Sequence, residues 1–146
     1  MEPELLALYG TLMSGEGGQE RLGLRGRLQS LGRCVLAGTL VELGWYPGLV
    51  LQPAGRVIGE LVRVADAGVL EVLDRYEGFD PASPEGSLFV RTRLVTLEPG
   101  VEAWAYVFTG EVPAGRVIAS GDWRAHRAAG PADPAGPADP AGSGGT

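Results

Sequence analysis

Residues 69–78 read VLEVLDRYEG, and this stretch predicts a helix that ends at a glycine. Its bulky residues recur at helical spacing: Val69, Leu70, Val72, Leu73 and Tyr76. Asp66 is placed to cap the first turn, and Gly78 can take the left-handed conformation just past the last turn. Glu77 then lies at the negative pole of the helix, where a carboxylate gains no electrostatic stabilisation. Glu77 is therefore either an ordinary solvated acid beside a cap glycine or a residue with a function.

The length and composition predict one folded domain followed by a tail. The chain has 146 residues, of which 45% are apolar, and this is enough for one sizeable core. We expect the domain to cover residues 1–129. Residues 130–146 repeat the sequence PADPAG and contain too few bulky apolar groups to offset the entropy of ordering them. They are predicted to form a disordered low-complexity tail.

The charge and the apolar pattern exclude two classes of partner. A net charge of -6 leaves no basic stripe for binding phosphates, so we expect no nucleic-acid partner. The longest apolar stretches are much shorter than the ~18 to 20 residues that a membrane span needs. The N-terminus is acidic, whereas a signal peptide begins with a basic segment. These features predict a cytoplasmic protein that does not enter a membrane.

The missing residue types narrow the possible chemistry. All 12 basic residues are arginines, so Schiff-base and P-loop lysines are ruled out. Cys34 is the only cysteine and lies in an apolar run, where a buried, inert thiol is expected. His126 is the only histidine and stands just before the tail, a poor place for a catalytic base. We therefore expect neither a metal site nor a cofactor, and acid/base work falls to carboxylates and tyrosines.

The remaining pattern predicts several strands and one further short helix. The helix is expected within residues 19–31, and the strands at residues 5–9, 33–43, 49–51, 57–64, 88–97 and 101–108. Glu98-Pro99-Gly100 predicts a hairpin with a loop of about three residues between the last two strands. On the final strand the large residues Trp104, Tyr106 and Phe108 share one face, and small residues share the other. This asymmetry indicates a curved, barrel-like sheet, and the fold class is α+β.

Three features in this order carry a family resemblance. The segment 8–12, LYGTL, ends the first strand, the segment 73–78, LDRYEG, closes the middle helix, and a hairpin follows. Together they resemble the γ-glutamylcyclotransferase-like superfamily, which includes γ-glutamylamine cyclotransferases and AIG2-like proteins. Supporting matches are the segments 46–48, 57–61, 89–92 and 118–123. The resemblance covers about residues 5–125.

The resemblance implies a small mixed β-barrel with a few short helices and a cavity at one end. It implies that Tyr9, Gly10, Thr11 and Leu12 line this cavity and bind substrate, and that Glu77 matches the catalytic glutamate. Phe89 departs from the family pattern, which often has tyrosine there, and this bears on substrate choice. Tyr106 stands where the family often has an aromatic residue. It either packs or donates a hydrogen bond to the substrate or to Glu77.

The implied reaction needs only groups that this chain has. In a γ-glutamyl compound the substrate's own α-amine can attack the γ-carbonyl, forming 5-oxoproline and releasing the amine beyond it. A base must take a proton from the amine, and the leaving nitrogen must gain one. One carboxylate can do both in turn, and burial, which raises the pKa of a carboxyl group, would suit both tasks. Backbone N–H groups of residues 10–12 could hold the substrate carboxylate or the developing oxyanion.

Three functional hypotheses follow. The first is an enzyme that cyclises a small-molecule γ-glutamyl amide or γ-glutamylamine, with Glu77 as general acid/base. The second is a non-catalytic module that binds a small carboxylated metabolite in the same cavity. The third is an interaction protein acting through its tail, which would lose its function if residues 130–146 were deleted. The amine beyond the γ-glutamyl group and the oligomeric state are not predicted by the sequence.

Overall fold

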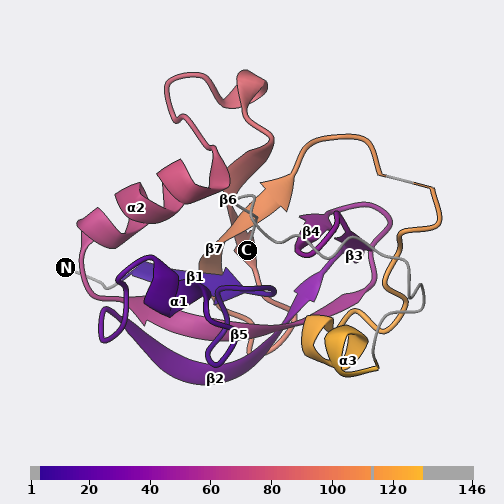
Figure 1. Cartoon of the computed structure of the whole chain (residues 1–146), viewed down its shortest axis with the longest axis horizontal. Coiled ribbons are helices and arrows are strands. Elements are labelled where there is room, and N and C mark those ends of the chain that lie inside the picture. The colour runs from indigo at the N-terminus through magenta and orange to yellow at the C-terminus, as the bar shows by residue number, and fades with distance from the viewer. Residues whose placement is uncertain (1–3, 113, 130–146) are drawn as a thin grey trace.

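A five-stranded sheet forms the centre of the molecule. The computed structural model describes residues 4–112 and 114–129. Figure 1 shows the sheet at the centre of the molecule. The strand order is β2-β5-β1-β7-β6. The strand bounds are β1 (Glu4–Leu8), β2 (Leu28–Ala37), β5 (Arg56–Val64), β6 (Phe89–Val95) and β7 (Glu102–Phe108). Neighbouring strands are antiparallel except β1 and β7, which are parallel.

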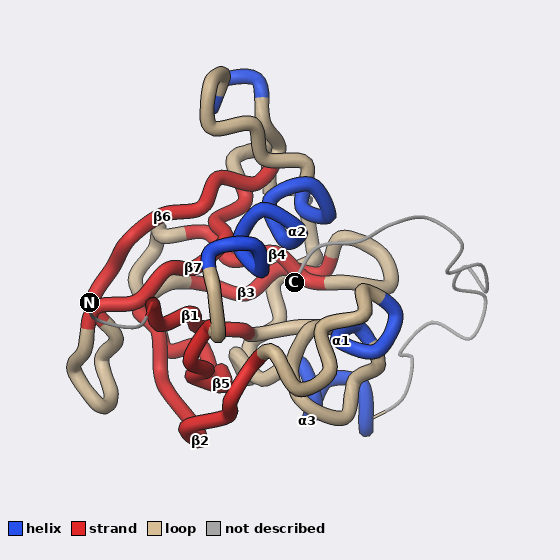
Figure 2. Tube along the Cα trace, turned by 90° about the vertical axis from the view of Figure 1, so that its left-hand side faces the viewer, coloured by secondary structure: helices blue, strands red, loops and turns tan. Residues whose placement is uncertain are grey.

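The sheet curves into a roughly barrel-like shape without closing among the described strands (Figure 2). Backbone hydrogen bonds link the edge strand β2 to the connection between β6 and β7. The Leu97 N–H donates to the Val35 carbonyl at 2.7 Å, and the Val35 N–H donates to the Glu98 carbonyl at 2.9 Å. The predicted α+β class and the small barrel-like sheet are thereby confirmed.

A second, two-stranded sheet consists of β3 (Thr39–Glu42) and β4 (Pro47–Val50). We predicted one strand over residues 33–43, but the chain turns from β2 into β3 at Gly38, which has a φ of 152°. A Cβ atom there would lie 2.6 Å from the Val50 carbonyl oxygen, so the approach of β4 requires glycine. The predicted strands at residues 49–51 and 57–64 both form, but they belong to different sheets.

The longest helix of the described chain is α2 (Ala67–Glu77), which lies across the sheet in Figure 1. Its apolar face is buried through Val69, Leu70 and Leu73, as the spacing predicts. Gly78 follows it with a φ of 75°, which confirms the expected left-handed cap. Asp66 occupies the N-cap position, but its side chain forms no capping bond and instead accepts a hydrogen bond from Arg27 at 3.0 Å.

Two elements differ in length from their predictions: the first helix is shorter, and the loop of the last hairpin is longer. The expected helix within residues 19–31 is reduced to α1 (Gly18–Arg21), because Gly23 and Gly26 adopt φ values of 69° and 83°, and β2 then begins at Leu28. The β6–β7 hairpin is confirmed, but its loop covers residues 96–101. Thr96 holds this longer loop, since its hydroxyl accepts hydrogen bonds from the N–H groups of Gly100 and Val101.

Two short helical elements stand on either side of the β6–β7 hairpin. The 3-10 turn η1 (Pro84–Gly86) precedes β6, and the helix α3 (Trp123–Ala128) follows β7. Trp123 is fully buried and anchors α3 to the core. The predicted tail at residues 130–146 lies outside the described residues. In the described part of the chain, none of the helices has both the length and the apolar character needed to cross a bilayer.

Candidate functional site

Tyr9 follows β1 and joins two other strands through its hydroxyl group. The side chain is fully buried. Its hydroxyl donates to the Tyr106 carbonyl of β7 at 2.6 Å and accepts from the Leu49 N–H of β4 at 3.1 Å. Tyr9 therefore fixes the end of β1 between β4 and β7.

The turn formed by Gly10, Thr11 and Leu12 is held by its own carbonyl groups. The Gly10 carbonyl accepts from the Met13 N–H at 3.0 Å, and the Thr11 carbonyl accepts from the Gly18 N–H at 3.0 Å. The Leu12 carbonyl accepts from the Gln19 amide at 2.8 Å. A Cβ atom on Gly18 would lie 2.5 Å from the Thr11 oxygen, so α1 packs this closely only because it begins with glycine. These bonds fix the backbone of the predicted substrate-binding turn.

Glu60 on β5 supports the segment just after this turn. Its carboxylate accepts from the Ser14 N–H at 2.7 Å and from the Ser14 hydroxyl at 2.6 Å. Arg124 of α3 lies 3.7 Å from the same carboxylate and donates to the Ser14 carbonyl. Burial of Glu60 acts to raise its pKa, but the hydrogen bonds from Ser14 and Ser30 and the charge of Arg124 outweigh burial and hold the pKa below its usual value.

Sequence reasoning missed this role of Glu60. The signal was a single acid in the strand VIGELV, where neighbouring positions are apolar and a charge is expected only if it has partners.

Glu77 is the last residue of α2 and is only 4% exposed. The interpretation of Glu77 as a solvated surface acid is therefore wrong. Glu77 lies three residues beyond Asp74, which accepts a hydrogen bond from Tyr106, so the two acids share one buried face of α2. The end of α2 thus turns this acid inward, against β7.

Tyr106 sits at the centre of a buried polar network. Its hydroxyl donates to Asp74 of α2 at 2.6 Å. Arg91 of β6 binds the same carboxylate through two nitrogens, at 2.8 and 3.1 Å, and its guanidinium lies 4.4 Å from the centre of the Trp104 ring. We had expected Tyr106 either to pack or to bond to Glu77 or the substrate, but the hydrogen bond recorded for its hydroxyl goes to Asp74.

The environment keeps the Tyr106 hydroxyl protonated. Burial, the hydrogen bond to Asp74 and the charges of Asp74 and Glu77 raise its pKa far above the usual range, and only Arg91 acts the other way. A weak sign of this network is visible in the sequence, because Asp74 and Glu77 are the two acids on the otherwise apolar inner face of the helix.

Tyr106 links the two predicted parts of the site. Its carbonyl binds Tyr9 at the start of the turn, and its side chain reaches Asp74 and the neighbourhood of Glu77 on α2. Tyr9 and Leu12 are fully buried, and Thr11 is 4% exposed. The turn and the helix end, 65 or more positions apart in the sequence, are therefore attached to the same strand.

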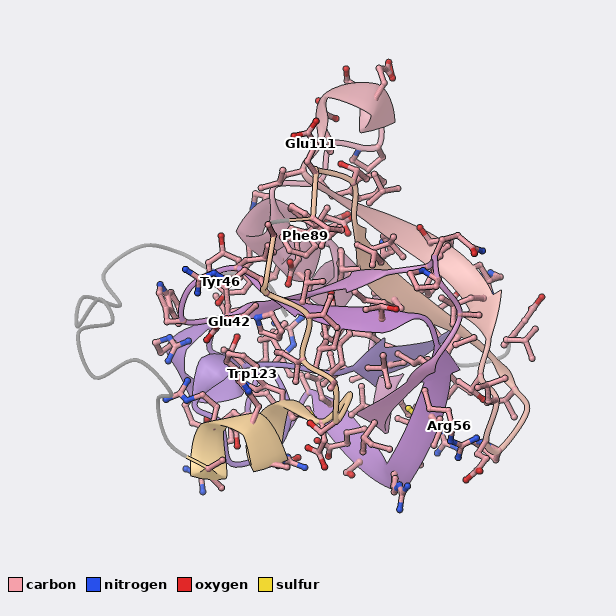
Figure 3. All side chains as sticks on the ribbon, turned by 90° about the vertical axis from the view of Figure 1, so that its right-hand side faces the viewer. Glu42, Tyr46, Arg56, Phe89, Glu111 and Trp123 are labelled. Carbon is pink, nitrogen blue, oxygen red and sulfur yellow. The ribbon has the colours of Figure 1, made fainter. Side chains whose placement is uncertain are left out.

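A separate open cleft of about 390 Å³ lies at the ends of β4 and β7. Its lining residues are Glu42, Leu43, Gly44, Tyr46, Leu88, Phe108 and Arg116. Figure 3 shows Glu42 and Tyr46 next to one another on this side of the molecule, with Phe89 nearby. Phe89 does not line the cleft directly but packs against Phe108, with ring centres 5.5 Å apart. Sequence reasoning did not find this cleft.

The side chains considered for other chemistry have structural surroundings. Cys34 is buried, and burial followed by the charge of Glu60 raises its pKa to about 12, as expected for an inert thiol. His126 on α3 lies 3.3 Å from a Glu42 oxygen and stacks on Trp123. Within residues 4–112 and 114–129, no three potential ligand side chains of His, Cys, Asp or Glu converge on a metal position.

The chain is similar in sequence to one curated protein and in structure to two solved proteins described below. The Gamma-glutamylcyclotransferase family protein YtfP of Escherichia coli strain K12 is 34% identical over 84 residues, which cover 58% of this chain and 66% of that protein, just under two thirds. An uncharacterized protein from Pyrococcus horikoshii has a similar structure, with a TM-score of 0.65 at 21% identity over 86% of this chain and 94% of that one. A mouse AIG2-like protein aligns with a TM-score of 0.59 at 24% identity over 77% of this chain and 82% of its own. The last two likenesses concern the fold alone.

A family model described as gamma-glutamyl cyclotransferase, AIG2-like, matches residues 6–125. The match begins within β1, before the Tyr9 turn, includes α2 with Glu77, and ends within α3. The chain therefore belongs to the AIG2-like gamma-glutamyl cyclotransferase family.

Proposed function

We propose that this protein converts a γ-glutamyl amide or γ-glutamylamine to 5-oxoproline and a free amine, with Glu77 as the general acid/base. The observation that carries the proposal is the burial of Glu77, at 4% exposure, on the face of α2 that also carries Asp74. Asp74 is hydrogen-bonded to Tyr106, and Tyr106 is hydrogen-bonded to Tyr9 at the predicted substrate turn. A carboxylate in this position is removed from bulk water and faces the strand to which the turn is attached. Family membership supports the same reaction class.

The reaction balances with one carboxylate and no external reactant. Glu77 takes a proton from the substrate's α-amine, and the amine nitrogen then attacks the γ-carbonyl carbon. A carbon–nitrogen bond forms in the five-membered ring, and the bond from the same carbon to the leaving nitrogen breaks. Glu77 returns this proton to the leaving nitrogen, and the second proton, which the ring nitrogen loses on becoming an amide, also ends on the released amine. The products are therefore 5-oxoproline and the amine in its ammonium form. No water is consumed.

The turn of Gly10, Thr11 and Leu12 supplies the binding part of the proposal. Its carbonyls are engaged by residues 13–19, so the peptide groups have a fixed orientation before the substrate arrives. Fixed backbone dipoles need no reorganisation in the transition state, which is the usual advantage of an oxyanion-binding turn. Holding the γ-glutamyl chain folded over this turn would bring amine and carbonyl together, an effect worth up to ~7 to 11 kcal/mol in well-oriented systems.

The substitution Glu77→Gln tests the proposal directly. It keeps the shape of the side chain but removes its ability to carry a proton, so we expect kcat/KM to fall by roughly 10²- to 10⁴-fold. The assay incubates the protein with a panel of γ-glutamylamines and γ-glutamyl dipeptides and detects 5-oxoproline. Glu71→Gln is the matched control, because Glu71 is an exposed acid on the same helix.

Two outcomes would change the conclusion. Unchanged turnover in a folded Glu77→Gln protein removes Glu77 from the mechanism. Thermal stabilisation of the wild-type protein by γ-glutamyl compounds, with no 5-oxoproline from any of them, identifies a binding module instead of an enzyme.

A further inference from the structure

The open cleft shares two strands with the proposed catalytic site. The Tyr9 hydroxyl bridges Leu49 of β4 and Tyr106 of β7. The same two strands supply walls of the cleft, since Tyr46 stands just before β4 and Phe108 is the last residue of β7. Phe108 lies two residues beyond Tyr106, so both side chains project from the same face of β7. The cleft therefore begins two residues along β7 from Tyr106, whose hydroxyl is bonded to Asp74 on the face of α2 that carries Glu77.

The walls of the cleft are held in place. A Cβ atom on Gly48 would lie 3.0 Å from Phe108 Cβ, so the absence of a side chain there lets the Phe108 ring pack against β4. The Leu88 carbonyl accepts hydrogen bonds from the Thr109 N–H and hydroxyl, at 2.8 and 2.9 Å. Leu88, with 51% exposure, is thus an apolar side chain on a fixed backbone at the mouth of the cleft.

The chemistry of the lining favours an apolar occupant. Leu43, Tyr46, Leu88 and Phe108 supply aliphatic and aromatic surface. The two charged lining residues neutralise one another, because Arg116 donates to Glu42 at 3.1 Å. A volume of about 390 Å³ falls within the range of small-ligand pockets and is large enough for a phenyl or branched alkyl group.

From this geometry we infer that the cleft is the subsite for the leaving amine, and that it selects γ-glutamyl compounds whose amine part is apolar or aromatic. The inference rests on the proposed cyclisation for the identity of the substrate. The γ-glutamyl half lies between the Tyr9 turn and Glu77, and the amine half extends along β7 over Phe108. An acidic amine part, as in γ-glutamylglutamate, finds no unpaired cation in the lining and binds less well.

The test compares γ-glutamylbenzylamide with γ-glutamylmethylamide. Leu88→Trp fills the mouth of the cleft and is expected to lower the ratio of kcat/KM for the benzylamide to that for the methylamide by roughly tenfold or more, the usual effect of a blocked apolar pocket. The matched control is Leu97→Trp, a leucine of similar exposure, 48%, at the opposite end of β6. The control should keep the wild-type ratio, and γ-glutamylglutamate should be a poorer substrate than the benzylamide for the wild type.

Equilibrium binding to the Glu77→Gln protein separates this inference from the proposed function. Binding of the benzylamide about tenfold tighter than that of the methylamide, lost when Leu88→Trp is added and kept with Leu97→Trp, supports the subsite whether or not the wild type forms 5-oxoproline. Equal binding of the two amides, or a selectivity that Leu88→Trp leaves intact, overturns the subsite even if 5-oxoproline is formed. Failure of the wild type to form 5-oxoproline from either amide counts against the proposed function alone.

Discussion

Two buried glutamates in this protein have different surroundings at the scale of single residues. Glu60 is surrounded by donors, with Ser14 binding it twice and Arg124 close by. These contacts hold its pKa low, so it remains a fixed negative charge. Glu77 shares the buried face of α2 with Asp74, which accepts from the Tyr106 hydroxyl, and burial and this bond raise the pKa of Tyr106. The protonated phenol, Asp74 and Arg91 form a buried hydrogen-bonded network near Glu77, the proposed general acid/base.

Replacement of Tyr106 by phenylalanine should destabilise the folded protein, because it removes one member of this network. The change removes the hydroxyl that donates to Asp74 at 2.6 Å, while Arg91 keeps both of its bonds to the carboxylate. Because hydrogen bonds to charged groups contribute about 1.5 to 3 kcal/mol, we expect the free energy of unfolding to fall by about that amount. Urea denaturation measures it.

The control for this substitution is Tyr46→Phe. Tyr46 is half-buried, and its hydroxyl has no recorded hydrogen bond to a described residue. Its loss should change the free energy of unfolding by less than that of Tyr106. Equal losses for the two variants would show that the Tyr106–Asp74 bond adds no net stability.

At the scale of elements, the end of α2 determines where Glu77 points. Gly78 adopts a φ of 75°, and its N–H and that of Phe79 donate to the carbonyls of Arg75 and Asp74, at 3.2 and 2.8 Å. The chain therefore leaves the helix in one direction immediately after Glu77. A residue that resists the left-handed conformation would disturb this exit.

Gly78→Ala is expected to cost about 1 to 2 kcal/mol in the free energy of unfolding, because alanine in the left-handed region carries a steric penalty of that size. No atom lies within 4 Å of the position where its Cβ would stand, so backbone strain is the only term. Thermal or urea unfolding measures the change.

Gly86→Ala provides the comparison for this prediction. Gly86 is in η1, its φ is not positive, and an added Cβ would meet only Ser83 Oγ, at an ordinary 3.8 Å. This variant should be as stable as the wild type or slightly more so. A Gly78→Ala protein as stable as Gly86→Ala would show that the left-handed cap does not define the helix end.

At the scale of the whole molecule, Glu60 connects three separate parts of the chain. It lies on β5, receives hydrogen bonds from Ser14 after the Tyr9 turn, and is close to Arg124 on α3. Its pKa is lower in the folded protein than in the unfolded chain, so its ionised form stabilises the fold. This contribution is complete above the unfolded pKa and is lost as the pH falls through the folded pKa.

Glu60→Gln should therefore reduce stability in a pH-dependent way. At pH 7 we expect the free energy of unfolding to be about 1 to 3 kcal/mol lower than in the wild type, since charged hydrogen bonds to Ser14 are replaced by neutral ones. The difference should begin to shrink as the pH falls through the ordinary glutamate range, and it should vanish only below the lowered pKa of folded Glu60, where the wild-type carboxyl group is also neutral. Urea denaturation at several pH values between 7 and 3 measures it.

Ser14→Ala is the companion variant. It removes the hydroxyl donor to Glu60 but leaves the backbone donor in place, so it should show a smaller version of the same pH dependence. A Glu60→Gln deficit that remains constant from pH 7 to 3 would mean that the charge of Glu60 does not stabilise the fold.

Local patterns in the sequence predicted most of the secondary structure. The spacing of Val69, Leu70 and Leu73 gave α2, and Gly78 gave its end, because these signals act within one helical turn. The alternation over residues 101–108 and the turn before it predicted the β6–β7 hairpin. One prediction failed where close tertiary approach decided the outcome, because Gly38 divides a continuous apolar run where β4 passes beside it. Another failed for a local reason, since glycines 23 and 26 adopt left-handed conformations and end α1 early.

The sequence by itself determined the family, the α+β class, the helix that ends at Glu77 and the absence of lysine chemistry, since all of these depend on residue types and their spacing. Only the tertiary structure decided that Glu77 is buried, that Tyr106 joins the Tyr9 turn to α2, and that Glu60 holds Ser14. It also placed Leu88 and Tyr46 at one cleft. These relations link positions tens of residues apart, and they depend on the strand order and sheet curvature that no local pattern encodes.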